Sequence, residues 1–287
     1  MKRILIPTDF STNANNALEY AAEISRLAGA TITLLHVYTP SVSPNNVIRA
    51  LIEDEIIDAK KDASIKLEVL KNTLETEYPG VSCKTEVAVG EAVKEILATA
   101  KASAIDLIIM GTLGASNLTR TLFGSNTASV IEKSHCPVLC IPAGCTFKVA
   151  ERILFATNFS YDDIKGILKL MPLVNAFKSE IIITHIDTTP ENDANNSSME
   201  KFVAEVKLVT GYARISQKIV NDHTVSMGLE SIIQELTIDL LALATHRRNF
   251  FEKFYNPSLT KKISLYTKIP ILVFHNPRDV EDTGKDF

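Results

Sequence analysis

The chain carries one pattern twice, and this repeat limits its possible folds more than any other feature. Residues 2–11 read KRILIPTDFS, and residues 151–160 read ERILFATNFS. Further along, the apolar segment that begins at Asp106 returns at Asp239 in the same register. Because matches lie near both ends of each half, they predict a tandem duplication of one domain of about 145 residues, a common domain size.

The two expected domains cover residues 1–146 and 147–287. In each, short apolar segments alternate with helical patterns, which predicts parallel strands with helices on both faces of the sheet. In the first half the expected strands are 3–7, 31–37, 82–89, 107–110 and 138–141, and the expected helices are 11–28, 46–78, 91–102 and 126–133. The expected fold class is therefore α/β, with two tandem doubly wound domains, each built on an open five-stranded parallel sheet.

The long helix expected at 46–78 is mostly polar. Its apolar residues fall on one side, namely Ile48, Leu51, Ile52, Ile56, Ala59 and Ala63. The first helix has clearer signals, because Ser11 is a suitable N-cap and Gly29 a suitable stop.

A glycine-rich turn follows the fourth expected strand. Gly111 and Gly114 are followed after nine residues by Gly124, and Ser125 comes next. Such a turn between a strand and a helix lets a polyanion approach the backbone, whose N–H groups and helix N-terminus can hold phosphate oxygens. Glycines can also serve only to turn a tight loop, which is the better interpretation of an isolated pair. The strand, the third glycine, the serine and the helix in this order favour phosphate binding.

The net charge and the lengths of the apolar runs argue against a nucleic-acid-binding protein and against a membrane protein. A net charge of −4 gives no reason to expect duplex nucleic acid as a partner. No apolar run approaches the roughly 18 residues of a membrane span, and the N-terminal apolar run ends at Asp9, too early for a signal peptide. We therefore expect a cytoplasmic protein without a membrane segment.

Four cysteines lie in the first half: Cys83, Cys136, Cys140 and Cys145. The last three, with His135, would fit a zinc site. However, paired C-x-x-C spacing is missing and Cys140 falls inside a strand pattern. We expect buried reduced thiols and no metal site.

Three segments in order resemble the universal stress protein family. They are Ile-Pro-Thr-Asp-Phe-Ser at 6–11, Leu-Leu-His-Val at 34–37 and the glycine pattern at 111–125. The resemblance covers the whole first half and, more weakly, the second. It implies a strand order of 3-2-1-4-5 in each sheet and a nucleotide cleft that holds ATP in one branch of the family. It leaves open whether Mg²⁺ or Mn²⁺ accompanies the ATP.

Carried over residue by residue, the resemblance divides the site of the first half into two sides. Asp9 would contact the ribose or adenine side, Pro7 and Thr8 would shape the turn around it, and Val37 would offer backbone groups to the adenine edge. The alternative for Asp9 is an N-cap of the first helix. The triphosphate side would be formed by Gly111, Gly114, Gly124, Ser125, Asn126 and Thr127.

The second half departs from this pattern where it matters. Asn158 stands in the place of Asp9, Ala244 in that of Gly111, Arg247 in that of Gly114 and Pro257 in that of Gly124. Side chains then fill the space of a phosphate tail, and proline lacks an N–H donor. We expect this half to have lost ATP. The basic residues near Arg247 could hold a smaller anion, but a solvated charged loop is the favoured interpretation.

The first hypothesis for function is a nucleotide-dependent stress-response regulator or interaction module, with an unidentified protein partner. Two alternatives are a slow metal-dependent ATPase that uses Asp9 and an interaction scaffold without nucleotide. No residue is assigned as catalytic. His36 and His185 occupy equivalent strand positions in the two halves, where a core or hydrogen-bonded role is favoured over catalysis.

The edge strands of the two sheets predict how the two halves contact each other. Segments 138–141 and 271–274 are the fifth strands of the two halves, and exposed apolar edge strands are usually paired or covered. We expect these two strands to meet within one chain, with Leu139 and Leu272 buried at the contact. A homodimer of such tandem chains is a further expectation, since the family tends to dimerise.

Overall fold

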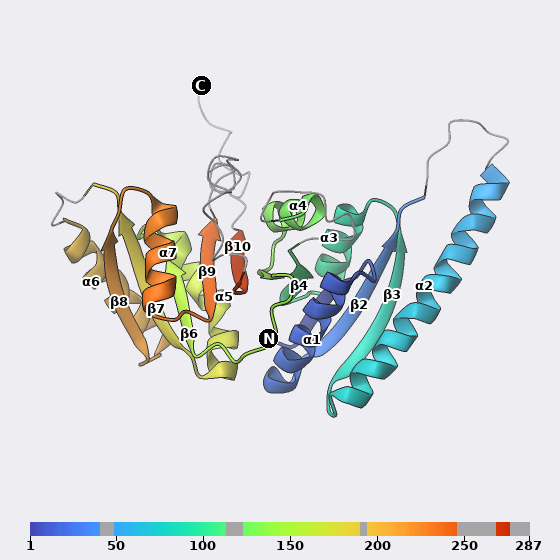
Figure 1. Ribbon diagram of the computed structural model, residues 1–287, viewed down its shortest axis with the longest axis horizontal. Coiled ribbons are helices and arrows are strands. Elements are labelled where there is room, and N and C mark those ends of the chain that lie inside the picture. Colours follow the sequence, from blue (N-terminus) through green and yellow to red (C-terminus); the bar gives the residue numbers. More distant parts are fainter. Residues whose placement is uncertain (41–48, 113–122, 190–193, 246–267, 276–287) are drawn as a thin grey trace, which may run out of the picture.

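The computed structural model describes residues 1–40, 49–112, 123–189, 194–245 and 268–275. Within them, ten strands form one sheet of order β3-β2-β1-β4-β5-β10-β9-β6-β7-β8 (Figure 1). The strands of each half are parallel, and the halves meet where β5 (Val138–Ile141) runs antiparallel to β10 (Ile271–His275). The order within each half is therefore 3-2-1-4-5, as the resemblance implies.

Among the described residues, every element of the first half except α4 has a counterpart in the second half. The first half has β1 (Arg3–Pro7), α1 (Thr12–Ala28), β2 (Thr31–Tyr38), α2 (Arg49–Glu77), β3 (Ser82–Val89), α3 (Ala92–Ala102), β4 (Leu107–Gly111), α4 (Ser125–Lys133) and β5. The second half has β6 (Arg152–Ala156), α5 (Tyr161–Phe177), β7 (Glu180–Asp187), α6 (Ala194–Thr210), β8 (Ile215–Asn221), α7 (Val225–Glu235), β9 (Leu240–Thr245) and β10.

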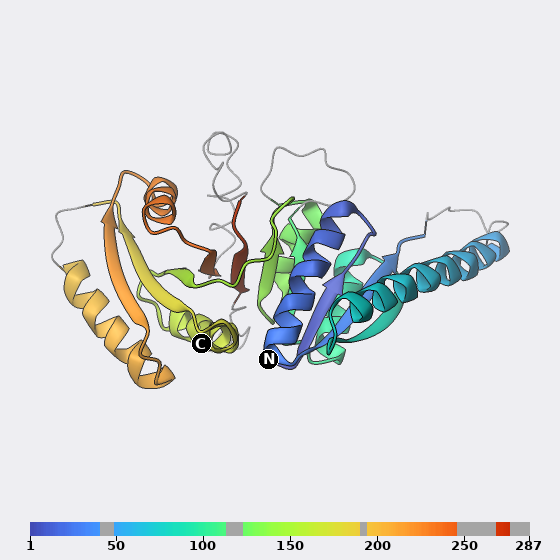
Figure 2. The same ribbon diagram turned by 60° about the horizontal axis from the view of Figure 1, so that its bottom comes forward.

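Helices cover both faces of the sheet (Figure 2). Helices α1, α2, α5 and α6 pack on one face, where residues such as Ile24 and Phe202 join one hydrophobic cluster. Helices α3, α4 and α7 pack on the other, where Ile96 and Ile232 belong to a second cluster. The strands contribute alternate side chains to the two clusters, as a sheet buried on both faces requires.

Local chemistry sets the ends of α1. The Ser11 side chain accepts a hydrogen bond from the Ala14 N–H at 3.2 Å, and Gly29 ends the helix with a φ of 64°. Glycine adopts this left-handed conformation without a steric penalty. Both predicted boundary signals of this helix are confirmed.

The apolar residues predicted on one side of helix α2 are buried unevenly, and Ile48, the first of them, lies outside the described residues. Ala63 is buried, but Ile56 and Ala59 are only half-buried, and the neighbouring Ile57 is 61% exposed. The first turns of the helix extend past the end of β3, so they have no sheet to cover (Figure 1). Burial begins further along the helix, where Leu67 is completely covered.

The segment that joins the two halves is packed between them. The Asn16 side chain on α1 donates to the Pro142 carbonyl oxygen at 3.1 Å. The Phe147 ring lies between Tyr20 of α1 and Phe177 of α5, with centroid distances of 4.9 and 6.3 Å. Aromatic contacts of this kind add to the stability gained from the buried area, so the join fixes α1 next to α5.

Candidate functional site

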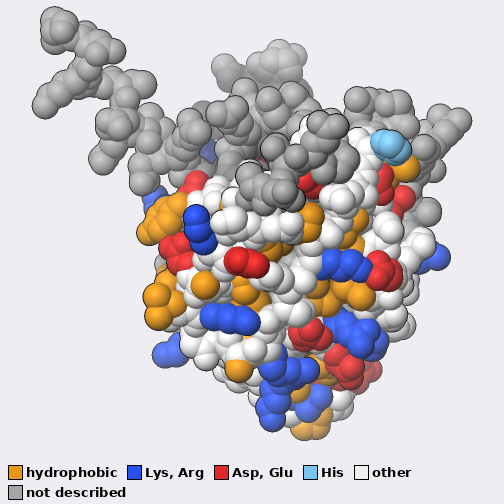
Figure 3. All heavy atoms as spheres, turned by 90° about the vertical axis from the view of Figure 1, so that its left-hand side faces the viewer, with side chains coloured by type: hydrophobic (Ala, Val, Ile, Leu, Met, Phe, Trp, Pro, Cys, Tyr) orange, Lys and Arg blue, Asp and Glu red, His pale blue; other side chains and the backbone are white. Residues whose placement is uncertain are grey.

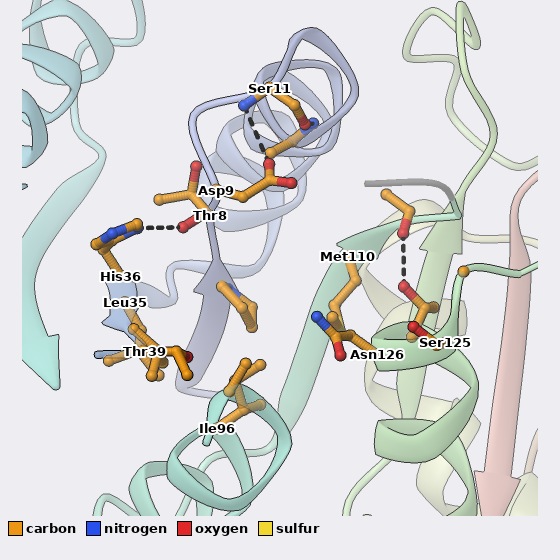
Figure 4. Close-up of a pocket in the computed structure, with 17 residues that line it drawn as sticks. Thr8, Asp9, Ser11, Leu35, His36, Thr39, Ile96, Met110, Ser125 and Asn126 are labelled. Carbon is orange, nitrogen blue, oxygen red and sulfur yellow. Dashed lines mark hydrogen bonds between the residues drawn. The ribbon is translucent and has the colours of Figure 1, made fainter. Parts of the chain in front are cut away.

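A cavity of about 390 Å³ opens in the first half at the carboxyl ends of β1, β2 and β4. Ligand sites of this size are common, and open parallel sheets bind ligands beyond the carboxyl ends of their strands. In Figure 4, Thr8, Asp9 and Ser11 come from the turn after β1, and Ser125 and Asn126 come from the start of α4.

The structure brings together nine of the ten residues proposed for the nucleotide site. Those that line the cavity are Pro7, Thr8, Asp9, Val37, Gly111, Gly124, Ser125, Asn126 and Thr127. Gly114, the tenth, lies outside the described residues. Three segments that are far apart in the sequence therefore converge on one cavity.

The turn after β1 is held by its own side chains. Thr8 Oγ1 accepts from the Phe10 N–H at 3.0 Å, and Asp9 Oδ1 accepts from the Ser11 N–H at 3.0 Å. Because Ser11 is the N-cap of α1, the alternative role of Asp9 as that N-cap is wrong. Asp9 stabilises the turn before the helix, and its exposed side chain lies at the cavity wall.

A histidine supports the same turn from β2. His36 Nδ1 lies 2.8 Å from the Thr8 carbonyl oxygen, and the His36 ring lies 4.6 Å from that of Phe10, whose φ is 61°. A carbonyl oxygen can only accept, so Nδ1 carries the hydrogen. The second half repeats the arrangement, with His185 Nδ1 at 2.9 Å from the Thr157 carbonyl oxygen. The predicted hydrogen-bonded role of both histidines is confirmed.

The start of α4 faces the cavity with no side-chain cap. Its N-cap is Gly124, and the side chains of Ser125 and Asn126 are exposed. Thr127 is buried, and its hydroxyl donates to the Gly111 carbonyl oxygen at 3.0 Å, which ties the helix to the end of β4. A helix N-terminus with this exposure favours anions, because its first N–H groups lack intrahelical partners.

Gly111 has a structural reason to be glycine that the motif did not reveal. A Cβ atom at this position would lie 2.5 Å from Asn13 Nδ2 and 3.0 Å from the Asn13 carbonyl oxygen. Helix α1 therefore packs directly on the backbone of β4. This close packing is a structural reason for glycine at position 111, and it stands beside the proposed role of Gly111 in the cavity lining.

An apolar wall completes the cavity, and the sequence analysis did not identify it. It consists of Leu35, Ala92, Ile96 and Met110 from β2, α3 and β4. The i, i+4 spacing of Ala92 and Ile96 on α3 was the available signal, but only the packing of α3 shows that this face meets a cavity. The described lining residues include one carboxylate, Asp9, and no lysine or arginine.

The remaining titratable groups give little sign of a second site in the described residues. There, no group of three or more His, Cys, Asp or Glu side chains could hold a metal ion. The four cysteines are free thiols, and Cys145 is only half-buried, contrary to the expectation of full burial. Burial raises the pKa of the Cys140 thiol, the most enclosed of them.

The outer end of the second half has a mixed surface. Figure 3 shows lysine and arginine side chains among acidic and apolar ones on the described part of this face. No basic stripe crosses that part, in keeping with the net charge of −4. No helix among the described residues has the length and apolar character needed to cross a membrane.

Comparisons with known proteins agree with the resemblance in the sequence. The chain is 33% identical over 154 residues to a universal stress protein of Methanocaldococcus jannaschii. The aligned residues cover 94% of that protein and 49% of this chain. The chain belongs to the universal stress protein family. The sequence profile of the Universal stress protein family matches residues 1–142. A universal stress protein of Bacillus subtilis is 30% identical over 146 residues, which covers 97% of that protein and 48% of this chain.

The similarity of folds extends over both halves of this universal stress protein. A crystal structure of a universal stress protein from Archaeoglobus fulgidus DSM 4304 superposes with a TM-score of 0.74. The match covers 96% of this chain and 98% of that chain, at 19% sequence identity. The tandem arrangement of two universal stress protein folds is thus shared with a solved structure.

Proposed function

We propose that the first half binds ATP in the cavity after β1 and β4, and that the chain acts as a nucleotide-dependent stress-response regulator or interaction module. One observation carries this proposal: nine residues of the family pattern, from three separate segments, line one cavity beside an uncapped helix N-terminus. Neutral backbone donors bind phosphate without ordering long side chains.

The two sides of the cavity suit the two ends of the nucleotide. The apolar wall of Leu35, Ile96 and Met110 provides a surface for the adenine ring. The first turn of α4, at Ser125, provides the donors for the phosphates. Asp9 lines the same cavity from the turn after β1, where a carboxylate can accept from ribose hydroxyls.

Binding is favoured over catalysis by the described lining. Phosphoryl transfer depends on cations that stabilise the developing charge, and the described lining residues offer neither lysine nor arginine. Mg²⁺ or Mn²⁺ held mainly by the phosphates fits a site with the single carboxylate of Asp9. We expect any hydrolysis to stay far below about one turnover per second, the lower end of ordinary enzyme rates.

The regulatory part of the proposal needs a partner that responds to the occupied site. The first turns of α2 extend past the end of β3, on the same half as the cavity (Figure 1). Ile57 is 61% exposed there, which gives a protein partner an apolar contact. Four free thiols agree with a reducing compartment, so we place this module in the cytoplasm.

Isothermal titration calorimetry of the whole chain with ATP tests the binding. We expect one equivalent per chain, and loss of binding in Gly114→Arg, which copies Arg247 of the second half. The reverse change, Arg247→Gly, should leave one equivalent. Two equivalents, no binding by the wild-type chain, or unchanged affinity in Gly114→Arg would overturn the proposal.

A further inference from the structure

The turns that follow β1 and β6 differ in the carboxylate that holds them. In the second half, Asp163 on α5 is 2% exposed and its Oδ2 accepts three hydrogen bonds. The donors are the Thr157 hydroxyl at 2.9 Å, the Asn158 N–H at 3.1 Å and the Ser160 N–H at 3.1 Å. The Asp163 N–H donates in turn to Ser160 Oγ, which completes a capping box.

The first half has no acid at the corresponding helix position. Ala14 stands there, three residues after the N-cap Ser11 as Asp163 is after Ser160, and it lines the cavity. The Ser11 N–H is bound instead by Asp9 Oδ1 at 3.0 Å, as the dashed line in Figure 4 shows. Asn158 has taken the place of Asp9 in the second half.

In both halves a carboxylate accepts a hydrogen bond from the N–H of the N-cap serine, but the carboxylate comes from a different position in each half. In the first half the acid comes from the turn and lies at the cavity wall. In the second it comes from inside the helix and is buried. We propose that the position of this carboxylate contributes, beside the glycine pattern, to the choice of which half accepts a nucleotide, and that Ala14 is a specificity-determining residue of the site. This inference rests on the proposed ATP binding of the first half.

A carboxylate at position 14 would weaken nucleotide binding because it would compete with the phosphate for the same part of the cavity. An aspartate at position 14 would lie in the cavity wall and accept from the hydroxyl of Thr8, as Asp163 does from that of Thr157. It would also occupy the positive N-terminal end of α1 with a charge of its own. A phosphate that enters the cavity would then meet a like charge in a partly desolvated wall, where repulsion is stronger than in water.

The charge can be tested apart from the side-chain volume. In the full chain, Ala14→Asp should weaken ATP binding by about tenfold or more in calorimetry, because a like charge is added next to the ligand. The same variant should not melt higher than wild type without ligand, because Asp9 already holds the Ser11 N–H and would repel a second carboxylate beside it. Ala14→Asn has nearly the same size without the charge, and its affinity should stay within about threefold of wild type.

A double substitution tests whether the carboxylate can move between the two positions. Asp9→Asn should lower both the melting temperature and the ATP affinity. Asp9→Asn with Ala14→Asp should recover the melting temperature but not the affinity, as in the second half.

Wild-type affinity in Ala14→Asp, equal losses in Ala14→Asn and Ala14→Asp, or recovered binding in the double variant would each overturn the inference. If the wild-type chain itself binds no ATP, the proposed function falls. The melting temperatures of the same variants then decide whether a carboxylate at position 14 can replace Asp9 in the turn.

Discussion

Leu139 and Leu272 lie opposite each other across the antiparallel pair of β5 and β10, and both side chains are completely buried. The pairing removes the two apolar edges that the separate halves would expose, and leaves β3 and β8 as the edges of the joined sheet. The predicted contact between the fifth strands is confirmed. One chain thereby forms a continuous sheet from two copies of its fold.

Leu139→Asp tests this contact. It places a charge in the middle of a buried strand pair and should lower the free energy of unfolding by about 3–5 kcal/mol. Small-angle scattering should show a larger radius as the halves separate. Leu139→Val keeps an apolar side chain in the strand and should retain the wild-type radius. A compact Leu139→Asp variant of unchanged stability would show that the contact does not hold the halves together.

The paired histidines offer a matched test of how the turn after β1 is held. His36→Leu removes the hydrogen bond to the Thr8 carbonyl oxygen and should weaken ATP binding severalfold, because the turn that carries Asp9 loses its support. His185→Leu removes the equivalent bond to Thr157 and should cost about 1 kcal/mol of stability without changing the affinity. Calorimetry and urea unfolding separate the two effects. Equal affinity losses in both variants would contradict the assignment of the site to the first half.

We expect the protein to lose stability at high pH because the pKa of the buried Cys83 thiol is raised. Burial, and then the nearby charge of Glu75, raise the pKa of Cys83 from 9.0 to about 12. The folded state holds this proton more tightly than the unfolded chain does. The contribution of the protonated Cys83 thiol to the free energy of unfolding is therefore fully present below about pH 9. It is lost as the pH rises toward 12, by up to about 1.4 kcal/mol per pH unit.

Urea unfolding between pH 8 and pH 10.5 measures this loss. Over that interval the wild-type stability should fall more steeply than that of Cys83→Ala, which has no thiol to ionise at this position. Parallel slopes for the two proteins would mean that the Cys83 thiol does not keep its proton on folding.

Local signals in the sequence predicted much of the fold. Ser11 and Gly29 mark the ends of α1 because capping and left-handed φ depend on adjacent backbone groups alone. The short apolar strand at 138–141 was likewise placed correctly, because its length and flanking residues distinguish it from a helix. The internal repeat extended the same prediction to the second half.

Other features depend on contacts that a sequence pattern does not contain. The need for glycine at Gly111 arises from Asn13, which approaches it only when α1 packs on β4. The role of Asp163 depends on how close its carboxylate comes to the preceding turn, where Asn158 and Ser160, five and three residues earlier, present their N–H groups. The partial exposure of α2 follows from where β3 ends, which its own periodicity does not reveal.

Native mass spectrometry of two matched variants with ATP tests the central claim most directly. Ala92 begins α3 and lines the cavity, and Val225 begins α7 at the corresponding position of the second half, where it is 41% exposed. Ala92→Trp should fill the adenine side of the cavity and remove the ATP adduct. Wild type and Val225→Trp should each carry one ATP per chain. An adduct that persists in Ala92→Trp, or that disappears only in Val225→Trp, would contradict the proposal that the first half holds the nucleotide.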